Sequence, residues 1–177
     1  MQPQSHQMPK PRVLYITSRG HSGSTLLSLL VSGHSQVVSA GELKMLSNPD
    51  PQRRLCSCHK QVPSECPFWG AVERRVKDRL GLSLDQLLLV EGGDDASFLR
   101  HNEELFAAIA GISGSALIVD SSKSLPRLSR LLKVEAKGAE FNLHPVHLHR
   151  GPFGSMNSAR KRGEVIRRSA FNYTRLF

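Results

Sequence analysis

Residues 13–25 read Val-Leu-Tyr-Ile-Thr-Ser-Arg-Gly-His-Ser-Gly-Ser-Thr, and this stretch decides the fold. Residues 13–17 form a short apolar, β-rich run that is typical of a buried parallel strand, and residues 26–31 predict a helix that packs back against it. The glycines and hydroxyl side chains between them allow a tight turn at a helix N-terminus, where free N–H groups and the helix dipole favour an anion. The pattern indicates a phosphate-binding loop, although serine and glycine are also common in ordinary turns and helix caps.

The loop differs from the Walker A motif of ATPases. That motif requires Gly-Lys-Ser/Thr, and the corresponding residues here are Gly23-Ser24-Thr25. A cation comes earlier in the loop instead, from Arg19 and His21. This departure argues against a standard ATPase and for a different phosphate ligand.

Length and composition bound the class of protein. The chain has 177 residues, of which 39% are hydrophobic and 22% charged, as expected for one globular domain with a core. We predict a flexible N-terminal tail over residues 1–11 and a single domain over residues 12–177. No run approaches the roughly 20 apolar residues of a membrane span, and residues 1–12 contain no apolar signal-peptide core. The default expectation is a cytoplasmic protein without a membrane span.

The formal net charge of +9 favours an anionic partner: a nucleotide, a nucleic acid, an anionic sugar or an acidic membrane surface. No aromatic-interleaved basic motif or recognition helix accompanies the charge, so nucleic acid is not the expected partner. Part of the excess is also compatible with a solvated basic face. The late cations are Arg150, Arg160, Lys161, Arg162, Arg167, Arg168 and Arg175.

Strands and helices alternate along the sequence. Further strands are predicted at residues 37–40, 116–119 and 146–149. Helices are predicted at residues 67–80, 84–90, 96–110, 126–135 and from 155 onward. This alternation predicts an α/β domain with three layers, in which helices flank a mainly parallel sheet. Residues 47–66 carry three prolines and all three cysteines, and we interpret them as an insertion outside the sheet.

Polar groups follow each predicted strand. The loop of residues 19–25, Glu42, the segment 120–123 and Arg150 all stand at strand ends. Ligands of parallel α/β sheets bind outside the carboxyl ends of the strands. The sequence therefore predicts one site at this edge of the sheet.

Two motifs, in this order, resemble those of sulfotransferases that use 3′-phosphoadenylyl sulfate (PAPS). Arg19-Gly-His-Ser-Gly-Ser-Thr-Leu-Leu27 looks like their 5′-phosphosulfate loop. His149-Arg-Gly-Pro-Phe-Gly-Ser-Met-Asn-Ser158 looks like their 3′-phosphate segment, in which a serine follows the arginine eight residues on. The resemblance covers roughly residues 12–160 and implies a P-loop NTPase-like fold. It implies PAPS as nucleotide cosubstrate, adenosine 3′,5′-bisphosphate as product, and a hydroxyl or amine acceptor.

The resemblance also implies roles for individual residues. The nucleotide would be held by Arg19, Gly20, His21, Ser22, Gly23, Ser24, Thr25, Arg150 and Ser158, with Ser155 as a competitor of Ser158. No metal is required, because the loop and the basic side chains supply the electrostatic stabilisation.

Three residues are candidates for the chemistry. Gly41-Glu42 resembles the Gly-Glu pair that provides the catalytic carboxylate in tyrosylprotein and similar sulfotransferases. Lys123 resembles a lysine that approaches the transferred sulfuryl group. His21 stands where many relatives carry lysine or arginine, so two options stay open: His21 acts as an imidazolium, or Arg19 and Lys123 carry the positive charge. Glu42 as a surface residue beginning a helix and Lys123 as a solvated first-turn residue are the plain alternatives.

The family pattern extends further than this sequence. Relatives usually continue into a Gly-x-x-Gly-x-x-Lys-like loop, so we expect the C-terminal part of the family domain to be missing. Whether the short chain is catalytically active is left open by the sequence. One alternative function is a P-loop nucleotide kinase or NTPase that uses magnesium and ATP. Another is a basic nucleotide-binding module without catalysis. The acceptor is not predicted, and a sugar, a small phenol, a lipid head group and a peptide tyrosine all remain open.

The cysteines admit three states. Cys56, Cys58, His59 and Cys66 suggest zinc, but Cys-x-Cys-His is an unusual spacing for zinc fingers. A similar cysteine insertion occurs in bacterial sulfotransferase-like sequences, where a structural disulfide or reduced thiols are at least as plausible. A cytosolic setting disfavours a permanent disulfide. We therefore expect no metal site.

Overall fold

A four-stranded sheet forms the centre of the molecule. The computed structural model describes residues 9–56, 61–90, 92–161 and 163. Within this part, β1 (Arg12–Ser18), β2 (Val37–Ser39), β3 (Leu117–Asp120) and β4 (Asn142–Leu148) lie in the order β2-β3-β1-β4. Every pair of neighbouring strands is parallel. The predicted α/β fold with a parallel sheet is confirmed.

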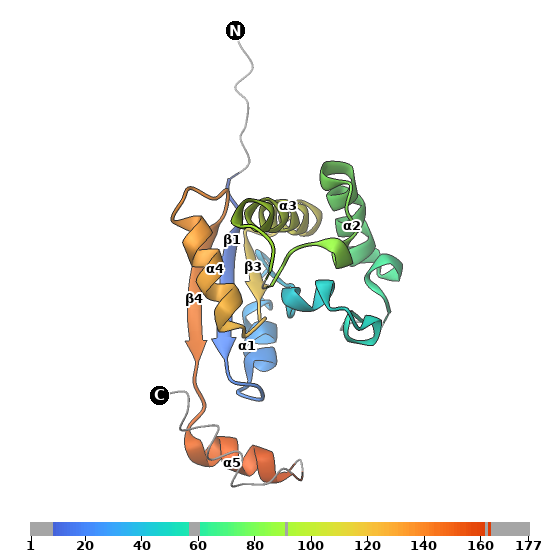
Figure 1. The fold of residues 1–177 in the computed structure, drawn as a ribbon. Helices are drawn as coiled ribbons and strands as arrows, with labels where there is room; N and C mark the ends of the chain where they lie inside the picture. The colour runs from blue at the N-terminus through green and yellow to red at the C-terminus, as the bar shows by residue number, and fades with distance from the viewer. Residues whose placement is uncertain (1–8, 57–60, 91, 162, 164–177) are drawn as a thin grey trace.

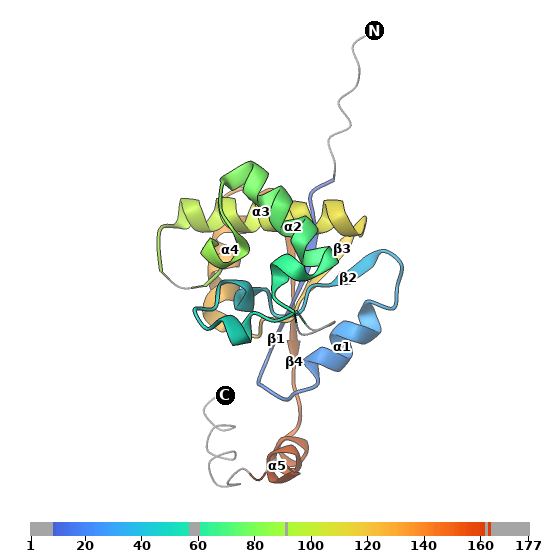
Figure 2. The same ribbon diagram turned by 90° about the vertical axis from the view of Figure 1, so that its right-hand side faces the viewer.

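Helices cover both faces of this sheet. α1 (Ser24–Val31) and α4 (Leu125–Glu135) lie on opposite faces, which gives three layers (Figures 1 and 2). α2 (Pro67–Leu80) packs against α3 (Asp95–Ser113), and both lie to the side of the sheet where β3 runs. α5 (Pro152–Lys161) follows β4 and lies beyond the carboxyl ends of the strands, apart from the main body (Figure 1). None of the described helices has the length and apolar content needed to cross a membrane.

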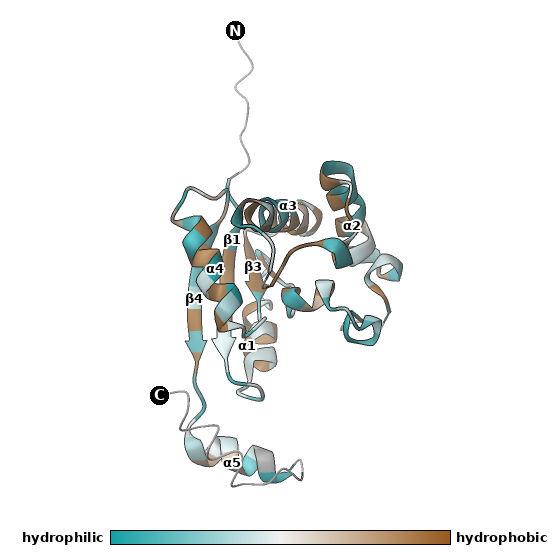
Figure 3. Ribbon diagram, viewed as in Figure 1, coloured by the Kyte–Doolittle hydropathy of each residue, from teal (hydrophilic) through white to brown (hydrophobic). Residues whose placement is uncertain are grey.

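The core lies between the central strands and helices α2 to α4. Val13, Tyr15 and Ile16 of β1 are fully buried, and β1 and β3 are predominantly hydrophobic in colour (Figure 3). On the opposite face, α1 turns two small residues inward, Ser24 and Ser28, and the Ser28 hydroxyl lies 2.7 Å from the Ser39 hydroxyl of β2. Three apolar side chains of this helix are exposed: Leu26, Leu29 and Leu30.

Two helix predictions agree closely with the structure. The helix at residues 67–80 has the predicted bounds, and Gly81 ends it with a φ of 70°. Asp94 caps α3 by accepting a 2.8 Å hydrogen bond from the Ser97 amide. That helix continues three residues beyond the predicted end, to Ser113, because the stop is supplied by Gly114 in the left-handed conformation.

Two other predictions need correction. The expected helix at residues 84–90 is only a 3-10 turn, Leu84–Gln86, after which the backbone extends and Leu87 and Leu89 enter the core. The last strand begins at Asn142, four residues before the predicted start. Pro145 argued against a strand at this position, because proline is rare inside strands. An edge strand such as β4 tolerates it.

The structure also describes the last residues of the expected N-terminal tail and parts of the expected insertion. Lys10 Nζ donates to the Ala139 carbonyl at 3.0 Å, and the Asn142 amide donates to the Pro11 carbonyl at 2.9 Å. Residues 10 and 11 therefore contact the domain, whereas residues 1–8 lie outside the described part. In its described parts, residues 47–56 and 61–66, the expected insertion lies outside the sheet and contains two short 3-10 turns, Pro51–Arg53 and Pro63–Glu65.

A buried ion pair joins the end of β3 to α4. Asp120 and Arg127 are both fully buried in their side chains, and Asp120 Oδ2 accepts from Arg127 Nε at 3.3 Å and Nη2 at 3.2 Å. Asp120 Oδ1 accepts from the amides of Ser122 at 2.9 Å and Leu43 at 3.4 Å. Arg127 Nη1 also donates to the Leu89 carbonyl. The ion pair thus joins three segments that are distant in sequence, around residues 43, 89 and 120–127.

Removing the charge of Asp120 should destabilise the protein strongly. Asp120→Asn leaves the Arg127 guanidinium buried without a counter-charge, and we expect the free energy of unfolding to fall by about 3–5 kcal/mol. Urea denaturation measures this. The matched control is Asp50→Asn, which neutralises an exposed carboxylate 3.6 Å from Arg53 and should cost no more than about 1 kcal/mol. Equal losses in the two variants would contradict the assigned role.

Candidate functional site

A cavity of about 620 Å³ opens at the carboxyl ends of β1 and β4. Its position is where parallel α/β sheets bind ligands, and its volume is that of a small-molecule site. Four segments form it: the end of β1 with the loop that follows, the start of α4, the end of β4 and the start of α5. The described lining residues are Thr17, Ser18, Arg19, Ser22, Lys123, Ser124, Leu125, Pro126, His147, Leu148, His149, Arg150 and Ser155.

Cations from separate parts of the sequence meet at this cavity. Arg19, Lys123 and Arg150 all line it. Arg150 Nη1 donates a 3.2 Å hydrogen bond to the carbonyl of His21, so the segment after β4 contacts the loop after β1. The structure therefore brings together the two motifs that the sequence analysis singled out, as the strand-end pattern predicted.

The loop after β1 presents its backbone to Arg150. His21 has a φ of 64° and Gly23 a φ of 96°, so the chain turns twice through the left-handed region before α1 begins at Ser24. This conformation is uncommon for a residue with a side chain. His21 is exposed and is not among the described lining residues of the cavity. The same holds for Gly20, Gly23, Ser24 and Thr25. Arg19, Lys123 and Arg150 are the cations that the cavity lining contains.

Glu42 and Lys123 form an ion pair at one end of the site. Lys123 Nζ lies 2.5 Å from Glu42 Oε1, and Lys44 Nζ lies 3.8 Å from Glu42 Oε2. Lys123 has a φ of 60°, and its amide donates to the Ile16 carbonyl of β1 at 3.2 Å. The two residues that the sequence proposed separately as base and cation thus contact one another.

Tyr15 fixes the turn that carries Lys123. The buried hydroxyl donates to the Ser124 carbonyl at 2.8 Å and accepts from the Ser124 amide at 3.2 Å. Burial, together with the nearby Asp120 carboxylate, raises the pKa of Tyr15 above its ordinary value. Sequence analysis placed this residue only in a strand, because nothing local to residue 15 indicates a partner so distant along the chain.

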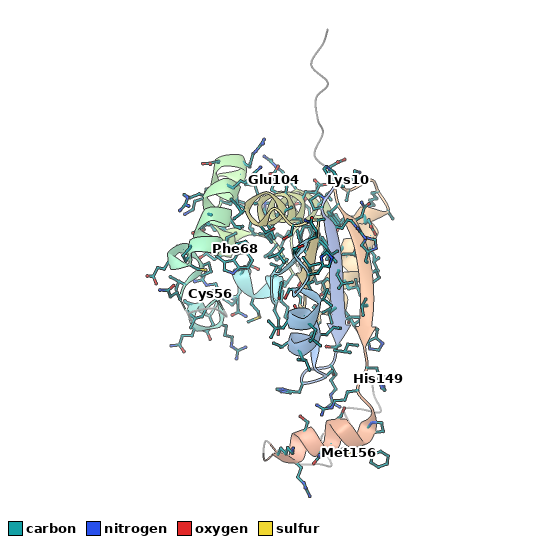
Figure 4. All side chains as sticks on the ribbon, turned by 180° about the vertical axis from the view of Figure 1, so that it is seen from behind. Lys10, Cys56, Phe68, Glu104, His149 and Met156 are labelled. Carbon is teal, nitrogen blue, oxygen red and sulfur yellow. The ribbon has the colours of Figure 1, made fainter. Side chains whose placement is uncertain are left out.

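The start of α5 is shaped around Arg150. Ser155 Oγ donates to the Arg150 carbonyl at 3.2 Å, and Ser155 lines the cavity. A Cβ atom at Gly154 would lie 3.0 Å from Arg150 Nε, so a side chain there would require Arg150 to shift by a few tenths of an ångström. Ser158 lies farther along α5, half-buried, and is not among the described lining residues. Figure 4 shows His149 in the connection between the sheet and α5.

Ser18 was not predicted as a site residue. It is the last residue of β1 and lines the cavity, and its Oγ is buried with no hydrogen-bond partner among the described residues. A buried polar atom without a partner is costly, so this hydroxyl fits a site that takes a polar ligand. The sequence signal was its position at the end of the strand before the loop.

Two of the three cysteines lie in the described part of the chain. Cys56 and Cys66 are buried in the core, and Figure 4 shows Cys56 on the part of the domain away from His149. Cys58 and His59 lie outside the described residues. Within the described ranges, no group of three or more His, Cys, Asp or Glu side chains could hold a metal ion.

Comparison with known proteins adds one structural likeness. No protein-family model matches the chain, and a search of curated proteins found no match. A solved structure, the sulfotransferase domain from the Synechococcus PCC 7002 olefin synthase, aligns with a TM-score of 0.44 and 22% sequence identity. The alignment covers 92% of this chain, and this chain spans 57% of that domain. A likeness of this extent does not decide activity, so function is inferred from the residues of the site.

The pKa of Tyr15 gives a testable dependence of stability on pH. Because folding raises this pKa, the unfolded chain loses the tyrosine proton first. The stability that the hydroxyl contributes is complete below about pH 10 and is lost as the pH rises through the folded-state pKa. We expect Tyr15→Phe to lower the free energy of unfolding by about 1–3 kcal/mol at pH 8, and the gap to wild type to narrow towards about pH 11. Denaturant titrations at each pH measure this, and parallel profiles would contradict it.

Proposed function

We propose that the chain is a sulfotransferase that binds PAPS in the 620 Å³ cavity and transfers its sulfuryl group to a hydroxyl or amine acceptor. The observation that carries this proposal is the hydrogen bond from Arg150 to the His21 carbonyl. It places the cation of the second motif beside the loop of the first, around a cavity of suitable size. Such an arrangement suits a ligand with anionic groups at both ends.

The chain's own residues divide into two groups around the nucleotide. Arg19 and Ser22, which line the cavity just before α1 begins, would hold the 5′-phosphosulfate, because a cation, hydroxyls and backbone N–H groups near a helix N-terminus favour an anion. Arg150 would hold the 3′-phosphate, since a guanidinium donates two parallel hydrogen bonds to phosphate oxygens. Ser155 or Ser158 would add a hydroxyl at the same end, and Ser18 supplies a buried hydroxyl within the cavity.

Glu42 and Lys123 would serve the transfer itself. PAPS supplies an activated sulfuryl group. Glu42 would take the proton of the acceptor hydroxyl while that oxygen bonds to sulfur. The bond from sulfur to the bridging oxygen breaks, and its electron pair stays on the phosphate of adenosine 3′,5′-bisphosphate. Lys123 and Arg19 would stabilise the charge that grows there.

Nucleotide binding tests the first half of the proposal. We expect calorimetry to detect binding of adenosine 3′,5′-bisphosphate, and Arg150→Ala to weaken it by about tenfold or more through loss of the paired phosphate contact. Arg79→Ala, which removes an exposed cation from the last turn of α2, is the matched control and should leave affinity unchanged. The proposal fails if the intact chain binds no nucleotide, or if Arg150→Ala behaves like the control.

Transfer of labelled sulfate tests the second half. We expect Glu42→Gln to lower the transfer rate from labelled PAPS by about 10²-fold or more, since the proton acceptor is lost. The affinity for adenosine 3′,5′-bisphosphate should stay within about twofold, because Glu42 lies outside the cavity lining. Full transfer activity in the variant would remove Glu42 from the chemistry.

The same preparations separate the alternative functions. A nucleotide kinase or NTPase would turn over ATP with magnesium, and the site offers the buried Ser24 where those proteins have the Walker lysine. A basic binding module without catalysis would bind polynucleotide with strong salt dependence and transfer no labelled sulfate. Sulfate transfer without ATP turnover is the result that the proposal expects.

A further inference from the structure

A second cleft, of about 230 Å³, adjoins Glu42. Among the described residues it shares no lining residue with the nucleotide cavity. The ion pair links the two spaces, because Glu42 lines the second cleft and Lys123 lines the nucleotide cavity. The described residues around the second cleft are Ala40, Gly41, Glu42, Met45, Leu46, Arg53, Arg54, Leu55, Cys56, Pro63 and Trp69.

We infer that this second cleft binds the sulfate acceptor, and that the acceptor is a single-ring hydroxyl compound that carries an anionic group such as a carboxylate. The inference rests on the proposed function, since it assigns the space next to the proposed base. It goes further by naming the chemistry of the acceptor. Three features of the cleft lead to it: one apolar wall, two arginines and the balance of charge.

The apolar wall suits the face of a ring. Trp69 is 9% exposed and packs edge-on against Phe68 at 5.1 Å between ring centroids, so its indole is fixed. Leu55 is 43% exposed and lines the same cleft, which leaves apolar surface available to a ligand. A volume of about 230 Å³ lies below the usual range of small-molecule pockets, so the cleft accommodates one ring and not an extended chain.

The two arginines are held differently. Arg54 Nη1 lies 2.5 Å from Asp85 Oδ2, and the Arg54 side chain is 20% exposed. The Ser83 hydroxyl and Arg54 lower the pKa of Asp85, so this carboxylate remains charged and keeps Arg54 in position. Arg53 has a side chain 69% exposed, and its ion pair with Asp50 is long at 3.6 Å. An exposed pair of this kind is worth little, so Arg53 can exchange Asp50 for an anionic ligand.

The charge balance of the cleft favours an anion. Glu42 is the one acid among its described lining residues, and it is already matched by Lys123 and Lys44. With the ion-pair partners counted, four cations (Lys44, Arg53, Arg54 and Lys123) stand against three carboxylates (Glu42, Asp50 and Asp85), which leaves one positive charge in surplus. A neutral ring would leave that surplus unused, whereas a carboxylate on the ring would complement it while the hydroxyl faces Glu42.

A pair of matched probes tests the inference by binding alone. We would measure 4-hydroxybenzoate and its neutral counterpart 4-hydroxybenzamide by NMR titration, with saturating adenosine 3′,5′-bisphosphate present. We expect the wild type to bind the carboxylate about tenfold more tightly than the amide. Arg53→Gln should reduce this ratio several-fold, because it removes the exchangeable cation. Arg74→Gln, an exposed arginine on α2 outside the cleft lining, should leave the ratio unchanged.

The outcomes separate the inference from the proposed function. Equal binding of both probes, no binding of either, or an unchanged ratio in Arg53→Gln overturns the inference. The same samples report nucleotide binding independently. If the nucleotide binds and the carboxylate shows no preference, the acceptor assignment alone fails. If the carboxylate preference depends on Arg53 but no nucleotide binds, the cleft is an anion site and the sulfotransferase proposal fails.

Discussion

The buried ion pair between Asp120 and Arg127 is the contact on which the rest of the site depends. Both oxygens of Asp120 are used, one by the guanidinium and the other by the amides of Ser122 and Leu43. A buried pair adds little net stability compared with an apolar replacement. Its effect here is geometric, because the segment that carries Glu42 and the segment that carries Lys123 are anchored to one carboxylate. The proposed base and cation are therefore adjacent before any ligand arrives.

The backbone on both sides of the cavity is held in an uncommon conformation. His21 and Lys123 have positive φ values without being glycine, which costs free energy that neighbouring contacts must offset. At His21 the offset comes from Arg150, and at Lys123 from the Ile16 carbonyl and the Tyr15 hydroxyl that holds Ser124. Strained residues of this kind concentrate at functional sites. Both lie at the carboxyl end of β1, His21 in the loop that follows the strand and Lys123 bonded to Ile16 near its end.

Sequence-based prediction succeeded where the deciding interactions are local and failed where they join segments that are distant in sequence. The bounds of α2 were predictable because apolar spacing and Gly81 are local signals. The strand-end pattern likewise predicted that Arg19, Lys123 and Arg150 would lie near one another, and all three line one cavity. The extended chain after Gln86 was not predictable, because burial of Leu87 and Leu89 overrides a helical spacing. The role of Tyr15 and the cleft beside Glu42 arise from contacts between distant segments, and no local pattern encodes them.

The close approach of Gly154 to the Arg150 side chain helps to recognise the same arrangement in other sequences. An arginine after a strand is common, and by itself it says little about where its guanidinium points. A Cβ atom at residue 154 would lie 3.0 Å from Arg150 Nε and 3.3 Å from Cγ, so the side chain that donates to the His21 carbonyl would have to shift by a few tenths of an ångström. The arginine together with a glycine at this position is therefore a more selective marker than the arginine alone. Loss of that glycine in another sequence would indicate a different path for the arginine side chain even where every charged residue persists.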